Sequence, residues 1–201
     1  MERKNTHPFG SKKRPENFEK ETEMLEVEAS NAQDTLALSD ILIQNYFTFI
    51  QRTLRPGKFG DINYAIHGMI GELAELTNEM VFKQLGANNQ KEIVAEAGDV
   101  LWYTMLLINT QYRTFQHIKV PYEGTNSAHT VIQQILHWID KICKYGTQHN
   151  FNSLTNTWEP RAECIDIRGY IEEILEFLLR YSDLTLPQLM KENMKKLDQL
   201  N

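Results

Sequence analysis

The sequence has little cysteine, no long apolar run and no surplus of basic residues. Its 201 residues include only two cysteines, Cys143 and Cys164, whose spacing matches neither a zinc site nor a redox motif. Two free thiols in a reducing compartment are therefore the plain interpretation. Residues 1–39 lack the apolar core of a signal peptide, and no segment approaches the roughly 20 apolar residues needed to span a bilayer. We expect a cytoplasmic protein with no membrane partner.

Basic charge is also scarce relative to acidic charge. Asp and Glu together number 27 against 21 Lys and Arg, which leaves a formal net charge of -6. Proteins that bind the phosphate backbone usually carry a basic surplus, so we expect no nucleic-acid partner. The small basic cluster at residues 12–14 is more typical of a solvated terminus than of a binding site. An anionic ligand would therefore need a local arrangement of charge.

What the sequence does contain is helical periodicity. Residues 1–35 are polar and charged, which predicts a flexible tail followed by one domain over residues 36–201. Beyond the tail, apolar residues recur at helical spacing, and no window alternates as a strand would. We predict an all-α fold, a helical bundle with short antiparallel connections. The expected helices cover about residues 38–54, 62–85, 91–115, 131–146, 164–178 and 185–197.

The second of these helices has an apolar side and an acidic side. Glu72, Glu75 and Glu79 share a strip with Gly68, and Gly71 lies at the edge of that strip. Each glycine costs a helix about 1 kcal/mol relative to alanine. Two explanations stay open: something approaches this backbone closely, or another helix packs against the small residues.

The third expected helix places acids in an apolar setting. Glu92, Glu96, Asp99 and Tyr103 fall on one narrow stripe, while apolar residues occupy most of the remaining circumference. An unpaired buried carboxylate costs several kcal/mol or loses its charge. A carboxylate such as Asp99 therefore needs a cation, a metal or a hydrogen-bond network as its partner.

Two pairs of acids, each spaced three residues apart, can face each other across these two helices. The pairs are Glu72 with Glu75 and Glu96 with Asp99, and neither contains histidine. The absence of histidine disfavours zinc and di-iron sites, whereas hard oxygen ligands suit Mg²⁺, with Mn²⁺ as a substitute. A single pair at this spacing usually marks only a solvated face. The two pairs together favour a metal site.

These residues lead to a family resemblance. The runs NYAIHGMIGELAELTNEMVFK and EIVAEAGDVLWYTMLL resemble the MazG-like all-α nucleoside triphosphate pyrophosphohydrolases, whose signature is Glu-x-x-Glu followed by Glu-x-x-Asp. The resemblance covers about residues 36–115 and includes Gly68, Lys83 and the run over residues 98–103. A weaker match is ENMKKLDQL, which looks like the Asn-x-x-Lys-Leu element of the family. Residues 116–184 depart from the short family core and form a divergent or inserted part.

The resemblance implies a fold, an activity and a set of site residues. The fold would be a four-helix catalytic core plus extra helices, and the enzyme would cleave a nucleoside triphosphate to a nucleoside monophosphate and pyrophosphate. It implies that four acids hold Mg²⁺, and one of the glutamates, with Glu75 as one candidate, would also orient the attacking water; the sequence does not decide which one. The expected metal and catalytic residues are Glu72, Glu75, Glu96 and Asp99, and the expected substrate-binding residues are Lys83, Tyr103, Asn193 and Lys196.

Other interpretations remain open at this stage. Tyr103 can contact the nucleoside or serve as a core aromatic, and Lys83 can reach the phosphates or pair with Glu79. The chain can also be a base-specific deoxynucleotide hydrolase of the dimeric dUTPase or dCTPase type, or an inactive helical oligomerisation or regulatory module. We further expect a homodimer or homotetramer, because so apolar a third helix commonly buries surface between subunits.

Overall fold

The computed structural model describes residues 32–111, 128–155, 157–161 and 166–199. These residues form six helices and one small sheet, which confirms the all-α class. The helices are α2 (Ala32–Thr53), α3 (Ile62–Gln84), α4 (Gln90–Gln111), α5 (Ala128–Thr147), α6 (Arg168–Ser182) and α7 (Leu186–Gln199). The strands are β1 (His149–Asn152) and β2 (Thr157–Pro160). Among the described residues, no helix combines the length and hydropathy that crossing a bilayer requires.

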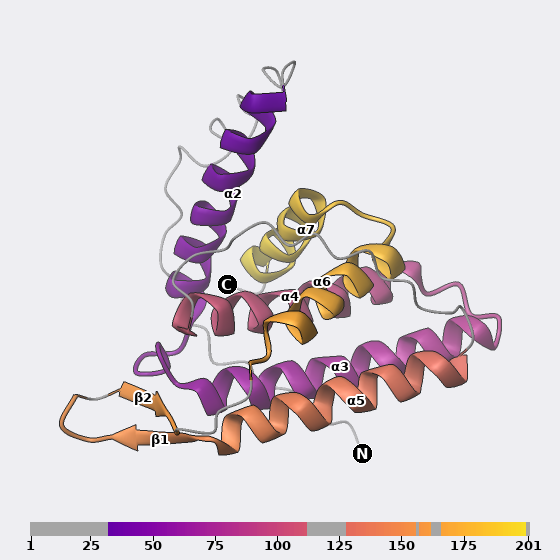
Figure 1. Ribbon diagram of the computed structural model, residues 1–201. Helices are drawn as coiled ribbons and strands as arrows, with labels where there is room; N and C mark the ends of the chain where they lie inside the picture. The colour runs from indigo at the N-terminus through magenta and orange to yellow at the C-terminus, as the bar shows by residue number, and fades with distance from the viewer. Residues whose placement is uncertain (1–31, 112–127, 156, 162–165, 200–201) are drawn as a thin grey trace.

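Helix α4 lies at the centre of the arrangement. It runs antiparallel to α3, and it also packs against α2, α6 and α7, while α5 lies along the other side of α3 (Figure 1). Because α4 has neighbours on several sides, the apolar residues that cover most of its circumference are buried, as predicted. Leu101 and Met105 are fully buried, for example. Helices of the same chain therefore cover the apolar surface from which we expected an oligomer interface.

Local sequence signals explain where several helices begin and end. Asp61 caps α3 by accepting a hydrogen bond from the backbone N–H of Tyr64 at 3.0 Å. Gly86 follows α3 with φ of 95°, a left-handed conformation that glycine adopts without strain. Before α7, the N–H of Thr185 donates to Gln188 at 2.9 Å and the N–H of Gln188 donates to the Thr185 hydroxyl at 3.4 Å. These reciprocal bonds form a capping box at the start of α7.

The prediction that the chain has no strand is wrong. Strands β1 and β2 form an antiparallel hairpin in which Phe151 lies opposite Trp158, with ring centroids 5.5 Å apart. Each strand has only four residues, too few for an alternating pattern to stand out from the surrounding polar segment. Cross-strand aromatic pairs of this kind stabilise hairpins. The available sequence signal was the occurrence of Phe151 and Trp158 in neighbouring segments, which indicates a cross-strand pair.

Three helix boundaries also differ from the predictions. Helix α2 begins at Ala32, within the range assigned to the tail, and α5 begins at Ala128, three residues before the expected start at about residue 131. Helix α6 begins at Arg168, later than predicted, and the carboxylate of Asp166 accepts from the N–H of Arg168 at 3.0 Å just before it. The rest of the predicted tail, residues 112–127 and Cys164 lie outside the described residues.

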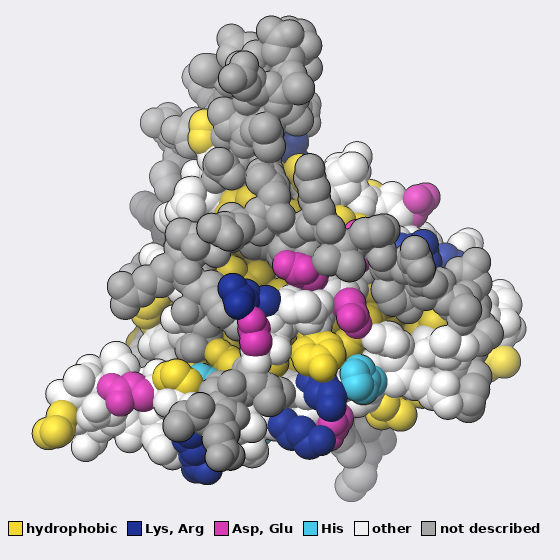
Figure 2. All heavy atoms as spheres, viewed as in Figure 1, with side chains coloured by type: hydrophobic (Ala, Val, Ile, Leu, Met, Phe, Trp, Pro, Cys, Tyr) yellow, Lys and Arg dark blue, Asp and Glu magenta, His cyan; other side chains and the backbone are white. Residues whose placement is uncertain are grey.

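Charged side chains of both signs are interspersed on the face of the molecule in Figure 2. Several form local ion pairs, such as Lys144 with Asp140 at 2.9 Å and Lys58 with Asp61 at 3.0 Å. Exposed pairs of this kind contribute little to stability, typically less than about 1 kcal/mol. The packing of α3 against α4 brings a second group of acids together, on the facing sides of these two helices.

Candidate metal centre

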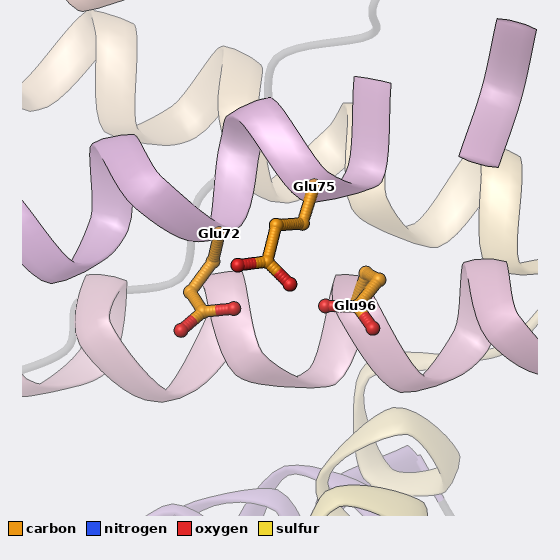
Figure 3. Close-up of side chains that lie close together, drawn as sticks. All are labelled: Glu72, Glu75 and Glu96. Carbon is orange, nitrogen blue, oxygen red and sulfur yellow. The ribbon is translucent and has the colours of Figure 1, made fainter. Parts of the chain in front are cut away.

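Three glutamates from two helices converge on one point. Glu72 and Glu75, three residues apart, project from one face of α3, and Glu96 projects from α4. Their carboxylates point toward one another (Figure 3). One carboxylate oxygen from each lies within 4.8 Å of the others. Glu72 and Glu96 are half-buried and Glu75 is exposed. We call these three residues the glutamate cluster.

The packing of the cluster changes the acidity of its members. Burial, followed by the negative charges of Asp99, Glu75 and Glu96, raises the pKa of Glu72 from 4.5 to about 7 against the opposing charge of Lys196. Burial also raises the pKa of Glu96, again against Lys196, with Asp99 and Glu75 adding to the rise. Without a cation, the ionised carboxylates therefore repel one another at close range.

The donor set of the cluster fits a hard divalent cation. All three ligand atoms are carboxylate oxygens, which Mg²⁺ and Mn²⁺ prefer. Mg²⁺ binds oxygen at about 2.1 Å, so opposite ligands around it lie about 4.2 Å apart. The 4.8 Å spread of the cluster exceeds this by an amount that small side-chain rotations can close. A bound cation would also offset the repulsion that adds to the effect of burial on the pKa of Glu72.

Asp99 lies beside the cluster and has its own partners. Its Oδ1 accepts from Nδ2 of Asn193 at 2.9 Å, and its Oδ2 accepts from Nζ of Lys196, both on α7. Burial lowers the pKa of Lys196, but the hydrogen bond to Asp99 and the charges of Asp99, Glu96 and Glu72 outweigh this effect and raise it. The structure therefore brings Asp99, Asn193 and Lys196 together next to the glutamates, and Asp99 is compensated by an ammonium group and an amide.

Tyr103 accounts for one of the two unusual glycines. A Cβ added at Gly68 would overlap the Tyr103 ring, whereas a Cβ at Gly71 would meet nothing within 4 Å. The close approach at Gly68 is therefore a contact with the neighbouring helix, and no described residue makes such a contact at Gly71. The ring of Tyr64 lies 5.9 Å from that of Tyr103. Burial, followed by the influence of Tyr64, raises the pKa of Tyr103, which therefore stays neutral.

An open pocket lies next to this aromatic pair. Its volume is about 500 Å³, and its lining combines aromatic, charged and amide groups: Lys58, Asp61, Asn63, Tyr64, His67, Gly68 and Tyr103. Gly68 is one helical turn before Glu72 on α3, and Tyr103 is one turn after Asp99 on α4. One turn advances the helix by about 5.4 Å, so the pocket adjoins the acidic site.

Lys83 lies elsewhere. It is eleven residues beyond Glu72 on the same helix, which corresponds to about 16 Å along the axis. Its Nζ donates to Gln90 at the start of α4, while Glu79 accepts from Nδ2 of Asn89 at 2.6 Å. These bonds tie the end of α3 to the start of α4. The structure thus gives Lys83 a partner in the connection and does not bring it to the glutamate cluster.

The sequence interpretation missed Tyr46 on α2. This residue is fully buried, and its hydroxyl donates to Oδ1 of Asn193 at 2.8 Å. A buried tyrosine usually finds a polar partner, so a tyrosine at a core-facing helix position was the available signal. Gly98 contributes as well, because a Cβ there would lie only 3.0 Å from Cβ of Asn193. Glycine at this position lets α7 approach α4 closely.

The arrangement as a whole could hold a cation next to a fixed positive charge. The glutamate cluster supplies negative charge for a metal, and Lys196 supplies a fixed positive charge within hydrogen-bonding reach of Asp99. The adjoining pocket offers aromatic faces for an uncharged part of a ligand. No family model, curated protein or solved structure matches this chain.

Proposed function

We propose that this protein is a Mg²⁺-dependent nucleoside triphosphate pyrophosphohydrolase, which converts a (deoxy)nucleoside triphosphate to the monophosphate and pyrophosphate. One observation carries the proposal: carboxylate oxygens from two antiparallel helices lie within 4.8 Å of one another in a half-buried setting. The resemblance of this region to the MazG-like enzymes points to the same activity. Both arguments concern residues on α3 and α4.

In this proposal Glu72, Glu75 and Glu96 hold Mg²⁺, for which Mn²⁺ can substitute. When bound, the ion supplies positive charge to phosphoryl oxygens and lowers the pKa of a coordinated water. Glu75 is the exposed member of the cluster, so its carboxylate is open to solvent. We assign it to orient the attacking water and accept its proton, while Glu72 and Glu96 hold the more buried side of the site.

Lys196 takes the phosphate side of the same site, and Asn193, whose amide is engaged by Tyr46 and Asp99, supports Lys196 through Asp99. Lys196 places an ammonium group beside the glutamates, where it offsets part of the charge that repels a triphosphate. Asp99 holds this ammonium in place, and Asn193 holds Asp99. Asp99 thus acts next to the glutamate cluster through its contacts with α7, and it would join the metal ligands when a bound cation displaces the Lys196 ammonium from it toward the phosphates. Lys83 has no part in the proposal.

The pocket beside Tyr103 would receive the nucleoside. Its aromatic side chains offer faces on which a base can stack, and its polar side chains offer hydrogen bonds to a base or sugar. Because the pocket lies about one helical turn from the acids, a nucleotide can place its base there and its phosphates at the glutamate cluster. Tyr103 is therefore assigned to substrate binding.

The test is pyrophosphate release by the full chain from a panel of nucleoside and deoxynucleoside triphosphates. We expect release that requires Mg²⁺ or Mn²⁺, stops on chelation, and falls at least about 100-fold in Glu72→Gln or Glu96→Gln. Glu92→Gln is the matched control, because Glu92 is an exposed acid one turn before Glu96 on the same helix. It should retain activity.

The same panel separates the alternatives. Near-normal turnover of Glu72→Gln and Glu96→Gln in excess Mg²⁺, or turnover that resists chelation, would contradict the assignment of the cluster. Activity confined to dUTP or dCTP would place the protein with the base-specific deoxynucleotide hydrolases. No release from any nucleotide would favour a helical regulatory module that has lost activity.

A further inference from the structure

A chain of two hydrogen bonds, one buried and one part-buried, connects α2 to the acidic site. The Tyr46 hydroxyl donates to Oδ1 of Asn193 at 2.8 Å, and Nδ2 of Asn193 donates to Oδ1 of Asp99 at 2.9 Å. Tyr46 has no exposed surface and Asn193 has only 2%. These three residues come from α2, α7 and α4, and we call them the positioning chain.

We propose that Tyr46 is a positioning residue of the metal site, which acts on Asp99 through the amide of Asn193. An asparagine amide can turn either its oxygen or its nitrogen toward a neighbour. In this structure the oxygen is held by the Tyr46 hydroxyl, so the nitrogen is directed at the carboxylate of Asp99. The inference rests on the metal site of the proposed function and concerns a residue that does not touch the metal ligands.

Two further features support this role. Burial, together with the charge of Asp99, raises the pKa of Tyr46, so the hydroxyl keeps its proton and remains a donor. The absence of a side chain at Gly98 lets Asn193 approach α4, because a Cβ there would lie 3.1 Å from Nδ2 of Asn193. Packing and hydrogen bonding therefore both hold the amide in one place. With Oδ1 engaged by Asn193, Asp99 presents Oδ2 toward Lys196 beside the glutamate cluster.

A purely structural role for the same hydroxyl is the competing explanation. Buried hydrogen bonds stabilise folds in general, and removing one partner destabilises the protein whether or not a site is nearby. Thr53 provides the matched control on the same helix, seven residues after Tyr46. Its hydroxyl accepts from Nε1 of Trp102 on α4 at 3.2 Å, away from the positioning chain. Loss of either hydroxyl should lower the melting temperature, but only loss of the Tyr46 hydroxyl should weaken metal binding.

The experiment measures the Kd for Mn²⁺ from the electron paramagnetic resonance signal of free Mn²⁺, with the full chain. We expect Tyr46→Phe to weaken Mn²⁺ binding about tenfold, at the lower end of the range for groups that orient metal ligands. Thr53→Val should leave the Kd unchanged within twofold. Equal Kd values for Tyr46→Phe and wild type, or equal losses in both variants, would overturn the inference.

A double-mutant cycle tests the route through Asn193 and covers the case in which Tyr46→Phe alone does not fold. Asn193→Leu should weaken Mn²⁺ binding at least as much as Tyr46→Phe. The double variant leaves no buried polar atom of this pair unpaired, so it should fold and show the same Kd as Asn193→Leu. A further tenfold loss in the double variant would show that Tyr46 does not act through Asn193.

The outcomes separate this inference from the proposed function. If Mn²⁺ binds and the Tyr46 variant binds it more weakly, but no nucleotide releases pyrophosphate, the positioning role stands and the proposed reaction fails. If metal-dependent pyrophosphate release occurs and the Kd of the Tyr46 variant is normal, the reaction stands and the positioning role fails. Absence of Mn²⁺ binding by the wild-type chain would overturn both.

Discussion

Raising the pH from 6 to 8 should strengthen the binding of a divalent cation to the glutamate cluster by about tenfold. The reason is the pKa of Glu72, which burial and the charges of Asp99, Glu75 and Glu96 raise from 4.5 to about 7. A metal binds the ionised carboxylate and must displace the proton from the neutral form. Metal affinity therefore rises through this pH range and levels off above it.

The magnitude follows from the fraction of Glu72 that is ionised. With a pKa of about 7, about one molecule in eleven is ionised at pH 6 and about ten in eleven at pH 8, which gives the tenfold ratio. The pKa of Glu96 is also raised, so its ionisation adds to the dependence in the same direction. Lys196 opposes both shifts, and its own pKa is raised, so it stays charged across this range.

The stability of the metal-free protein should change in the opposite direction. Because the pKa of Glu72 is higher in the folded protein than its ordinary value, the folded state holds a proton that the unfolded chain releases between pH 4.5 and 7. Glu72 therefore favours unfolding increasingly as the pH rises through that window. In the presence of a chelator, this effect of Glu72 should lower the melting temperature as the pH rises through that window. Saturating Mn²⁺ should abolish this decrease.

The assay is Mn²⁺ binding at pH 6, 7 and 8 at constant ionic strength, followed by the signal of free Mn²⁺. Glu72→Gln should bind more weakly and show a smaller pH dependence, while Glu92→Gln should behave as the wild type does. A wild-type Kd that changes less than twofold between pH 6 and 8, or that weakens as the pH rises, would refute the reasoning about the cluster.

Three further predictions concern stability and assembly. Gly68→Ala should destabilise the fold by about 1–3 kcal/mol in urea unfolding, because the added Cβ would overlap Tyr103. Gly71→Ala should be neutral or stabilising by up to about 1 kcal/mol, because its Cβ meets no atom. Equal effects of the two substitutions would contradict the packing described. Trp138→Phe should cost about 1–3 kcal/mol in the same assay, because it removes the 2.7 Å bond from Nε1 to Glu173 that joins α5 to α6; an unchanged unfolding midpoint would count against that bond. Light scattering should give the mass of a dimer or tetramer, because apolar side chains are exposed on several helices, among them Ile41, Phe82 and Leu136. A mass of one 23.5 kDa chain would argue against assembly.

The helices that carry the site were predictable because their signals are local. The spacing of apolar residues in α3 and α4 indicated both helices to within a few residues at the ends that the structure describes. The spacing of Glu72 and Glu75 placed them on one face of α3, and the structure confirms that they face Glu96 on α4. The hairpin was missed because its stabilising pair, Phe151 and Trp158, joins two strands that are each too short to show a pattern.

The partner of Asp99 illustrates what a local signal leaves open. The apolar surroundings of this residue indicated that its charge needs a cation, a metal or a hydrogen-bond network. The partners in the structure are Asn193 and Lys196, which lie 94 and 97 residues further along the chain. No spacing rule connects residues so far apart, so a search for motifs could list all three without showing that they meet.

The sequence by itself determined the helices, their acidic and apolar faces and the chemical type of the candidate ligands, because these depend on residues within a turn or two of one another. Only the tertiary structure decided which acids meet, that α7 compensates Asp99, and that a tyrosine of α2 reaches the same place. The contact between Tyr46 and Asn193 spans 147 residues and depends on how α2, α4 and α7 pack. Packing is a property of the whole chain, and it sets which side chains share a buried environment.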